Sequence, residues 1–154
     1  MAGTLSRQLA QFVSKLTYDD LPQDVADKVK ARIIHAIGTG LAAYDDHFLQ
    51  RFWRLIKTEE RRDKGGATIL VDGSMVTRPG AAFANCALMR ARQHTDSYQL
   101  LTHPAAHTVP ASLAIAEGRE CTGKEFIAGV AAGLEVGVHI CSNPKIIPAT
   151  QAHG

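Results

Sequence analysis

Apolar residues recur every three or four positions along most of this chain, and this helical spacing constrains the fold more than any other feature. The pattern is present in six segments: 5–16, 22–42, 45–56, 79–88, 110–117 and 122–138. Only 67–77 has a convincing strand pattern, since Asp72-Gly73 can supply the two positive-φ positions of a tight hairpin turn. The sequence therefore predicts an all-α fold, a helical bundle with one small β-hairpin near 67–77.

Capping residues and prolines predict where several helices begin. Asp20 can cap the second helix, with Pro22 in its first turn. Pro110 is expected to begin the fifth helix, which Gly118 closes. Thr122-Gly-Lys-Glu125 has the spacing of a capping box at the start of the last helix.

Small and apolar residues predict which helix faces are buried. The apolar face of the second helix widens toward its end, so we expect its C-terminal half, with His35, to be buried. Gly38 and Gly40 lower helix propensity there, and close approach of a neighbouring helix is the usual compensation. Small-residue tracks near 80–88 and 129–137 also predict tight packing between helices.

The composition is that of a globular protein and argues against two classes of partner. The 154 residues are 45% hydrophobic and 21% charged with a net charge of +2, and we expect one helical domain over 1–154, with 145–154 irregular. Basic residues are scattered, which argues against nucleic acid. The longest apolar run, between Lys124 and Glu135, is too short for a membrane span.

Cysteine usage and the first residues indicate the compartment. The three cysteines, Cys86, Cys121 and Cys141, are far apart and form no CxxC motif, so we expect them to be reduced. The first residues lack the apolar core of a signal peptide. A cytoplasmic location is therefore expected.

The segment from Arg90 to Pro110 is the candidate site, because it places polar, titratable residues between apolar helical segments. Pro104 disfavours helix at the preceding His103, which should be held in an extended loop and could act as a general acid or base. The alternative for His103 is a surface or helix-capping histidine. Asp96 could orient His103 or bind substrate, or else cap a helix.

Six further side chains of this segment are candidates for substrate contacts. Ser97 and Thr102 could bind a carboxylate or satisfy the loop backbone, and Arg90 and Arg92 could pair with an anion or complement a helix dipole. His94 and His107 complete the set: Ser97, Thr102, Arg90, Arg92, His94 and His107. The histidines lack metal-ligand spacing on a predicted helix, so we expect no metal site and no cofactor.

Several segments resemble the N-terminal part of the MmgE/PrpD family, which includes 2-methylcitrate dehydratase, cis-aconitate decarboxylase and iminodisuccinate epimerase. The resemblance lies in these segments: Leu21-Pro22, Ile37-Gly-Thr-Gly-Leu-Ala-Ala43, Pro79-Gly-Ala-Ala-Phe-Ala-Asn85, Thr102-His103-Pro104, Val109-Pro110-Ala-Ser-Leu-Ala-Ile-Ala-Glu117 and Gly123-Lys-Glu-Phe-Ile-Ala-Gly-Val-Ala-Ala-Gly-Leu-Glu-Val136. The pattern from Thr102 to Glu117 is the more specific part.

The resemblance implies a helical domain, usually dimeric, with a site for small di- or tricarboxylates. It also implies that His103 is a catalytic acid or base, that Asp96 shapes the site, and that no metal or organic cofactor takes part. Family proteins are much longer, so the chain is expected to be truncated to about their first third. Where they typically have His-Ala-Leu-Asp-Phe-Asp-Asp-Thr, this chain has Arg90-Ala-Arg-Gln-His-Thr-Asp-Ser97.

Two hypotheses from different classes follow, and a third stays open. The first is a lyase or isomerase in which His103 moves a proton on a small anionic metabolite, through dehydration, decarboxylation or isomerisation. The second is a non-catalytic truncated paralogue that serves as a dimerisation or regulatory module. The third is a new binding pocket in the retained helices. In each case we expect a homo-oligomer, or a partner chain that completes the fold.

Overall fold

The computed structural model describes residues 4–92, 94–98 and 102–141. The elements in chain order are α1 (Leu5–Lys15), the short 3-10 helix η1 (Tyr18–Asp20), α2 (Gln23–Leu41), α3 (His47–Glu59), β1 (Ala67–Thr68), β2 (Met75–Val76), α4 (Arg78–Arg90), α5 (Pro104–Gly118) and α6 (Gly123–Cys141). This is the predicted all-α fold with one small hairpin. The predicted tail at 145–154 lies outside the described residues.

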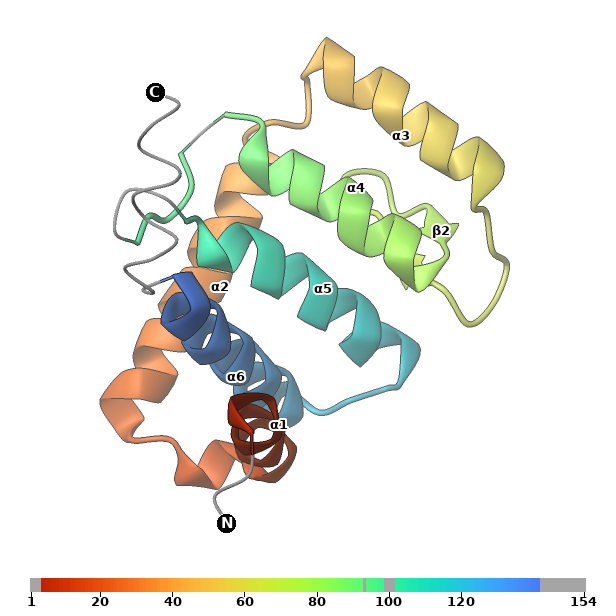
Figure 1. Cartoon of the computed structure of the whole chain (residues 1–154). Coiled ribbons are helices and arrows are strands. Elements are labelled where there is room, and N and C mark those ends of the chain that lie inside the picture. The colour runs from red at the N-terminus through yellow and green to blue at the C-terminus, as the bar shows by residue number, and fades with distance from the viewer. Residues whose placement is uncertain (1–3, 93, 99–101, 142–154) are drawn as a thin grey trace.

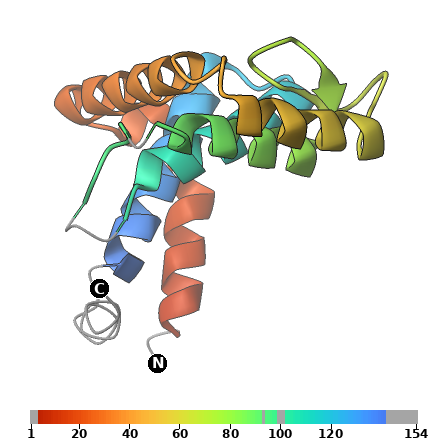
Figure 2. The same ribbon diagram turned by 90° about the horizontal axis from the view of Figure 1, so that it is seen from above.

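Helix α5 occupies the middle of the bundle (Figure 1). It packs between α4 and α6, α3 covers the other side of α4, and α2 contacts α4, α5 and α6. Helix α1 lies beside α6, at a distance from α3 (Figure 2). The loop between α4 and α5 carries the candidate residues, so the helices with the most extensive mutual packing hold it at both ends.

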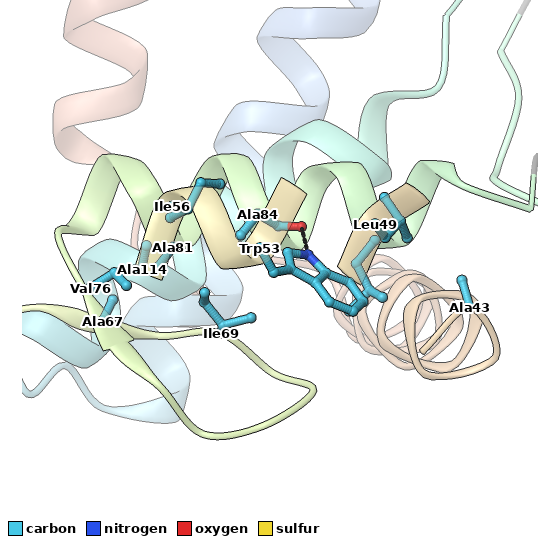
Figure 3. Packing of buried hydrophobic residues seen from close by; sticks show 11 residues of the cluster. Ala43, Leu49, Trp53, Ile56, Ala67, Ile69, Val76, Ala81, Ala84 and Ala114 are labelled. Atoms are coloured by element: carbon cyan, nitrogen blue, oxygen red, sulfur yellow. Dashed lines mark hydrogen bonds between the residues drawn. The ribbon is translucent and has the colours of Figure 1, made fainter. Parts of the chain in front are cut away.

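Two clusters of buried side chains form the core. The first joins α3, α4 and the hairpin around Trp53, whose indole Nε1 donates a hydrogen bond to the Ala84 carbonyl at 3.4 Å (Figure 3). Leu49 and Ile56 lie on the same face of α3 and are also buried. The second cluster joins α2, α4, α5 and α6 around Val109 and Val130, and it includes Ala105 and Ala106 in the first turn of α5, which follows His103.

The hairpin is antiparallel, with Ala67 opposite Val76, but its strands have two residues each. Only Gly73 has a positive φ in the turn, at +74°, so the prediction that Asp72 also adopts one is wrong. The Asp72 carboxylate instead accepts a hydrogen bond from the Ser74 amide, and this bond between a side chain and the backbone stabilises the turn.

A buried asparagine fastens the hairpin to α4. The Asn85 side chain accepts from the Leu70 amide at 3.0 Å and donates to the Thr68 carbonyl at 2.9 Å. Only 1% of Asn85 is exposed, and both contacts are backbone groups of the same hairpin. Two strands of this length need such support, because an isolated hairpin is marginally stable in water.

Helix caps confirm one prediction and correct another. The Thr122 hydroxyl and amide both bond Glu125, and the Glu125 amide donates to the Thr122 hydroxyl, so the capping box is present. Asp20 does not cap α2, because its carboxylate accepts from the amide and hydroxyl of Thr17 at the start of η1. The cap residue of α2 is Pro22, which has no side-chain donor or acceptor.

The start of α5 also differs from the prediction. The helix begins at Pro104, and Pro110 lies inside it, fully buried. A proline is favoured in the first turn, so Pro104 is the better start, and the amide missing at Pro110 costs one internal hydrogen bond. His107 therefore belongs to a helix and not to the loop.

Burial of α2 and α6 is narrower than predicted. Gly40 is buried and a Cβ there would meet Leu88 and Met89 at 3.2–3.4 Å, which confirms close approach of α4, but Gly38 and His35 are exposed. Helix α2 buries a single stripe because α4, α5 and α6 all contact it from one side.

The glycine track of α6 packs closely at one point only. A Cβ at Gly133 would meet the Thr108 methyl at 2.4 Å, which confirms tight packing against α5. Gly129 and Gly137 have open space within 4 Å, so the packing predicted for them is wrong. They line an apolar groove of about 900 Å³ between α6 and α1, with Val13 and Leu16 on its other wall. This groove is called the α1–α6 groove below.

Candidate functional site

His103 is the N-cap residue of α5, and its backbone has φ −125° and ψ 70°. Pro104, the first helical residue, keeps His103 out of the helix, as the sequence predicted. The imidazole is half-buried, between the end of α4 and the start of α5. It is therefore anchored at the start of α5 and remains partly accessible from the surface.

The Nδ1 atom of His103 is fixed by two oxygen atoms. It lies 2.6 Å from the backbone carbonyl of Asp96 and 3.0 Å from the Thr95 hydroxyl. A carbonyl can only accept, so Nδ1 carries the hydrogen and donates it to Asp96. A neutral His103 then has its lone pair on Nε2, which is the nitrogen able to take up a proton.

Asp96 holds the loop through a different set of contacts. Its carboxylate accepts from the Ala105 amide at 3.1 and 3.2 Å, at the N-terminus of α5. The guanidinium of Arg32, on α2, lies 3.7 Å from the same carboxylate. Asp96 is 7% exposed, so a buried negative charge meets the positive end of a helix and one cation. The carboxylate therefore caps a helix, the alternative that the sequence left open, and only the carbonyl of Asp96 meets His103.

Arg90 reaches the same histidine through Thr95. One guanidinium nitrogen of Arg90 donates to the Thr95 hydroxyl at 3.3 Å, and that hydroxyl is the one in contact with His103. Sequence reasoning did not select Thr95 or Arg32. The resemblance described above leads us to expect an acid at position 95, where this chain has Thr95, and that departure was the signal that could have found it.

His107 lies one turn beyond His103 and faces a cysteine on α4. Its Nδ1 is 3.2 Å from Sγ of Cys86. Burial lowers the pKa of His107, as does the nearby positive charge of Arg90, and burial raises the pKa of the Cys86 thiol. Both groups are consequently neutral near pH 7, and they form a thiol–imidazole hydrogen bond beside the site.

The remaining predicted residues are not drawn into one cluster. Arg92 pairs with Asp45 at 2.6 Å and so holds the end of α4 to the turn before α3. Thr102 and Tyr98 form two backbone hydrogen bonds with each other, at 2.9 and 3.4 Å, which hold these two positions of the loop side by side. His94 and Ser97 are exposed. The structure brings Arg90, Thr95, Asp96 and His103 together and leaves Arg92 outside.

The described part of the chain contains no group of three or more histidine, cysteine or acidic side chains arranged to hold a metal ion. Among the same residues, no helix is long and apolar enough to cross a membrane. What the cluster offers chemically is an oriented imidazole with a basic nitrogen, next to a guanidinium. This combination suits proton transfer on a molecule that carries a negative charge.

The model of the MmgE/PrpD N-terminal domain matches residues 7–148. No curated protein and no solved structure matches the chain.

Proposed function

The chain belongs to the MmgE/PrpD family. On this premise we propose that it acts as a lyase or isomerase that moves a proton to or from a small molecule with a carboxylate group. The reaction would be a dehydration, a decarboxylation or an isomerisation. Each of these needs a group that removes or returns a proton next to a carboxylate, and His103 is our candidate.

The observation that carries this proposal is the contact between Nδ1 of His103 and the Asp96 carbonyl. It fixes the orientation of the imidazole and leaves Nε2 as the basic nitrogen, which is what a general base requires. The acceptor is the backbone carbonyl of Asp96, and the carboxylate of the same residue bonds the Ala105 amide at the start of α5. Asp96 is thus a positioning residue in this proposal and does not itself exchange a proton.

Arg90 is our candidate for the residue that binds the carboxylate of the substrate. It lies beside His103 through Thr95, and a guanidinium matches the two oxygens of a carboxylate. Ser97, Thr102, His94 and His107 are further candidate contacts in the same segment. Arg92 is left out, because its ion pair with Asp45 already occupies it.

The experiment is turnover of a panel of small di- and tricarboxylates, including cis-aconitate and 2-methylcitrate. The purified chain, His103→Ala and the matched control His35→Ala are assayed alone and with fractions of cell lysate. His35 is an exposed histidine on α2, so its removal should leave turnover unchanged. Turnover lost with His103 but kept with His35→Ala supports the proposal, whereas turnover that survives in His103→Ala refutes it.

The alternative is a non-catalytic domain of the same fold, and one observation favours it. The Asp96 carboxylate already bonds the N-terminus of α5 and lies beside Arg32, and a threonine contacts His103 where the family resemblance leads us to expect an acid. A panel without any turnover, together with unchanged stability and assembly of His103→Ala, would support this second function.

Association with a second copy of the chain is part of either function. Helix α1 has no buried residue, and its Phe12 and Val13 are both exposed, with Val13 lining the α1–α6 groove. An uncovered apolar face of this kind is typical of subunit contacts. We therefore expect a dimer in sedimentation velocity at micromolar concentration, and a monomer with Val13→Asp. A monomeric parent chain would refute this assignment.

A further inference from the structure

Helix α3 has a second apolar stripe, which faces solvent. Leu49, Trp53 and Ile56 point into the core, as Figure 3 shows, whereas Phe48 and Leu55 are 77% and 59% exposed. Positions 48, 52 and 55 are separated by four and three residues, so their side chains form a continuous row. One helix therefore uses one apolar row for the core and leaves the other uncovered.

Helix α4 extends this exposed row. Phe83 is 61% exposed, and its ring meets Phe52 edge-on, with centroids 5.0 Å apart and planes at 75°. Large side chains carry roughly 150–250 Å² each, so the exposed parts of Phe48, Leu55 and Phe83 present about 300–500 Å² of apolar surface. Patches of this size on a single chain often mark interaction sites. These four residues, Phe48, Phe52, Leu55 and Phe83, are called the α3 face below.

Two arginines border the α3 face. Arg51 and Arg54 lie along the solvent side of the same helix, both exposed. Within the described ranges 4–92, 94–98 and 102–141, no ion pair involves either guanidinium. An apolar row with unneutralised cations beside it is complementary to a surface with apolar residues and acidic neighbours.

We propose that the α3 face binds an amphipathic helix whose apolar row is bordered by acidic residues. The row from Phe48 to Leu55 is about 10 Å long, so a partner helix of two to three turns covers it. Its apolar residues would lie at i, i+4 and i+7 and pack on Phe48, Leu55 and Phe83. Its acids would pair with Arg51 and Arg54.

Two other occupants fit the same face less well. A second copy in a symmetric dimer would bring Arg51 and Arg54 against the same arginines of the partner, and like charges repel. An anionic membrane would attract the arginines, but a flat bilayer would also cover exposed Glu59, which lies one turn beyond Leu55 and would be repelled. A partner helix that covers only the row from Phe48 to Leu55 ends before Glu59. An acidic helix satisfies the apolar row and the arginines together.

The test uses two synthetic helical peptides with the same leucine row, one with glutamates and one with lysines beside it. Fluorescence anisotropy is measured with the parent chain, Phe48→Ser, and Arg51→Glu combined with Arg54→Glu. The control variant is Arg7→Glu, a charge reversal on the exposed helix α1. All substitutions are at exposed positions, and circular dichroism checks that each variant is folded.

We expect the glutamate peptide to bind at least tenfold more tightly than the lysine peptide. Phe48→Ser should weaken its binding at least tenfold, the double arginine reversal should invert the preference, and Arg7→Glu should change neither. Amide shifts in NMR spectra should concentrate on α3 and around Phe83. Equal binding of both peptides, binding that survives Phe48→Ser, or shifts elsewhere would overturn the proposal. So would dimerisation that Phe48→Ser abolishes, or binding to vesicles of anionic phospholipid that exceeds binding to the glutamate peptide.

Discussion

Replacing Asp96 by asparagine tests how the loop with His103 is fastened to the bundle. The substitution keeps the size of the side chain and one oxygen that can accept from the Ala105 amide. It removes the negative charge that faces the N-terminus of α5 and the Arg32 guanidinium. The fold should persist. The decrease in the free energy of unfolding should equal the stabilisation that the negative charge of Asp96 gains from the N-terminus of α5 and from Arg32.

The magnitude follows from the two contacts. A carboxylate at a helix N-terminus contributes about 0.3–1 kcal/mol when exposed and up to about 2 kcal/mol when partly buried, and Asp96 is buried. The Arg32 side chain is 50% exposed and 3.7 Å away, so its pair contributes about 0–1 kcal/mol after solvent screening. The expected loss is therefore about 1–3 kcal/mol, a fall in Tm of roughly 2–12 °C for a chain of this size.

Urea unfolding followed by circular dichroism measures the loss, with Arg32→Gln and the double variant completing a mutant cycle. Arg32→Gln alone should cost less than about 1 kcal/mol, and the coupling between the two sites should not exceed that amount. Long-range 1H–15N NMR spectra should still show the hydrogen of His103 on Nδ1, because its acceptor is the backbone carbonyl. An Asp96→Asn loss below about 0.3 kcal/mol, or a loss as large for Arg32→Gln, would show that the helix cap is not the main contact.

Three further predictions concern the core and the neighbouring titratable pair. Asn85→Ala should lower the free energy of unfolding by about 2–4 kcal/mol in urea titrations, because two buried backbone groups of the hairpin lose their partner; a cost under about 1 kcal/mol would contradict this. Cys86 should react several-fold more slowly with iodoacetamide at pH 8 than the exposed Cys121, read by peptide mass spectrometry, because burial raises the pKa of its thiol; equal rates would refute this. Burial lowers the pKa of His107 in the folded chain, so the folded chain binds fewer protons than the unfolded chain. The resulting contribution of His107 to the free energy of unfolding is complete above the unfolded pKa, near 6.5, and is lost as the pH falls through the folded pKa. The drop in unfolding free energy between pH 7 and pH 5 should therefore be smaller in His107→Gln than in the parent or in His35→Gln, and three equal drops would count against it.

The sequence predicts the helices well where local signals decide them. Periodic apolar residues and the capping box at Thr122 depend on neighbours within a few positions, and these segments agree with the structure. The errors arise where two signals compete for one role. Pro104 and Pro110 can each begin a helix, and only packing of Val109 and buried Pro110 against the core shows that the helix extends back to Pro104.

Burial was harder to predict because it depends on the number of neighbours a helix has. The second helix has enough apolar residues for a broad buried face, but its neighbours α4, α5 and α6 contact only one side. Ile34 is 71% exposed for that reason. Gly129 and Gly137 are a second example, because a glycine allows a neighbouring helix to approach closely, but among the described residues no atom of another helix lies within 4 Å of a Cβ at either position.

The site shows most clearly what a local pattern cannot contain. The sequence placed Asp96 and His103 in one loop and suggested that the acid orients the base. In the structure the orienting atom is the backbone carbonyl of Asp96, and its carboxylate is directed to Ala105 and Arg32. Arg32 is distant in sequence and could be recognised only once α2 was placed against α5. The helix start at Pro104 explains this arrangement, because it creates the N-terminus that attracts the Asp96 carboxylate, so that of the Asp96 oxygens only the backbone carbonyl contacts His103, beside the Thr95 hydroxyl.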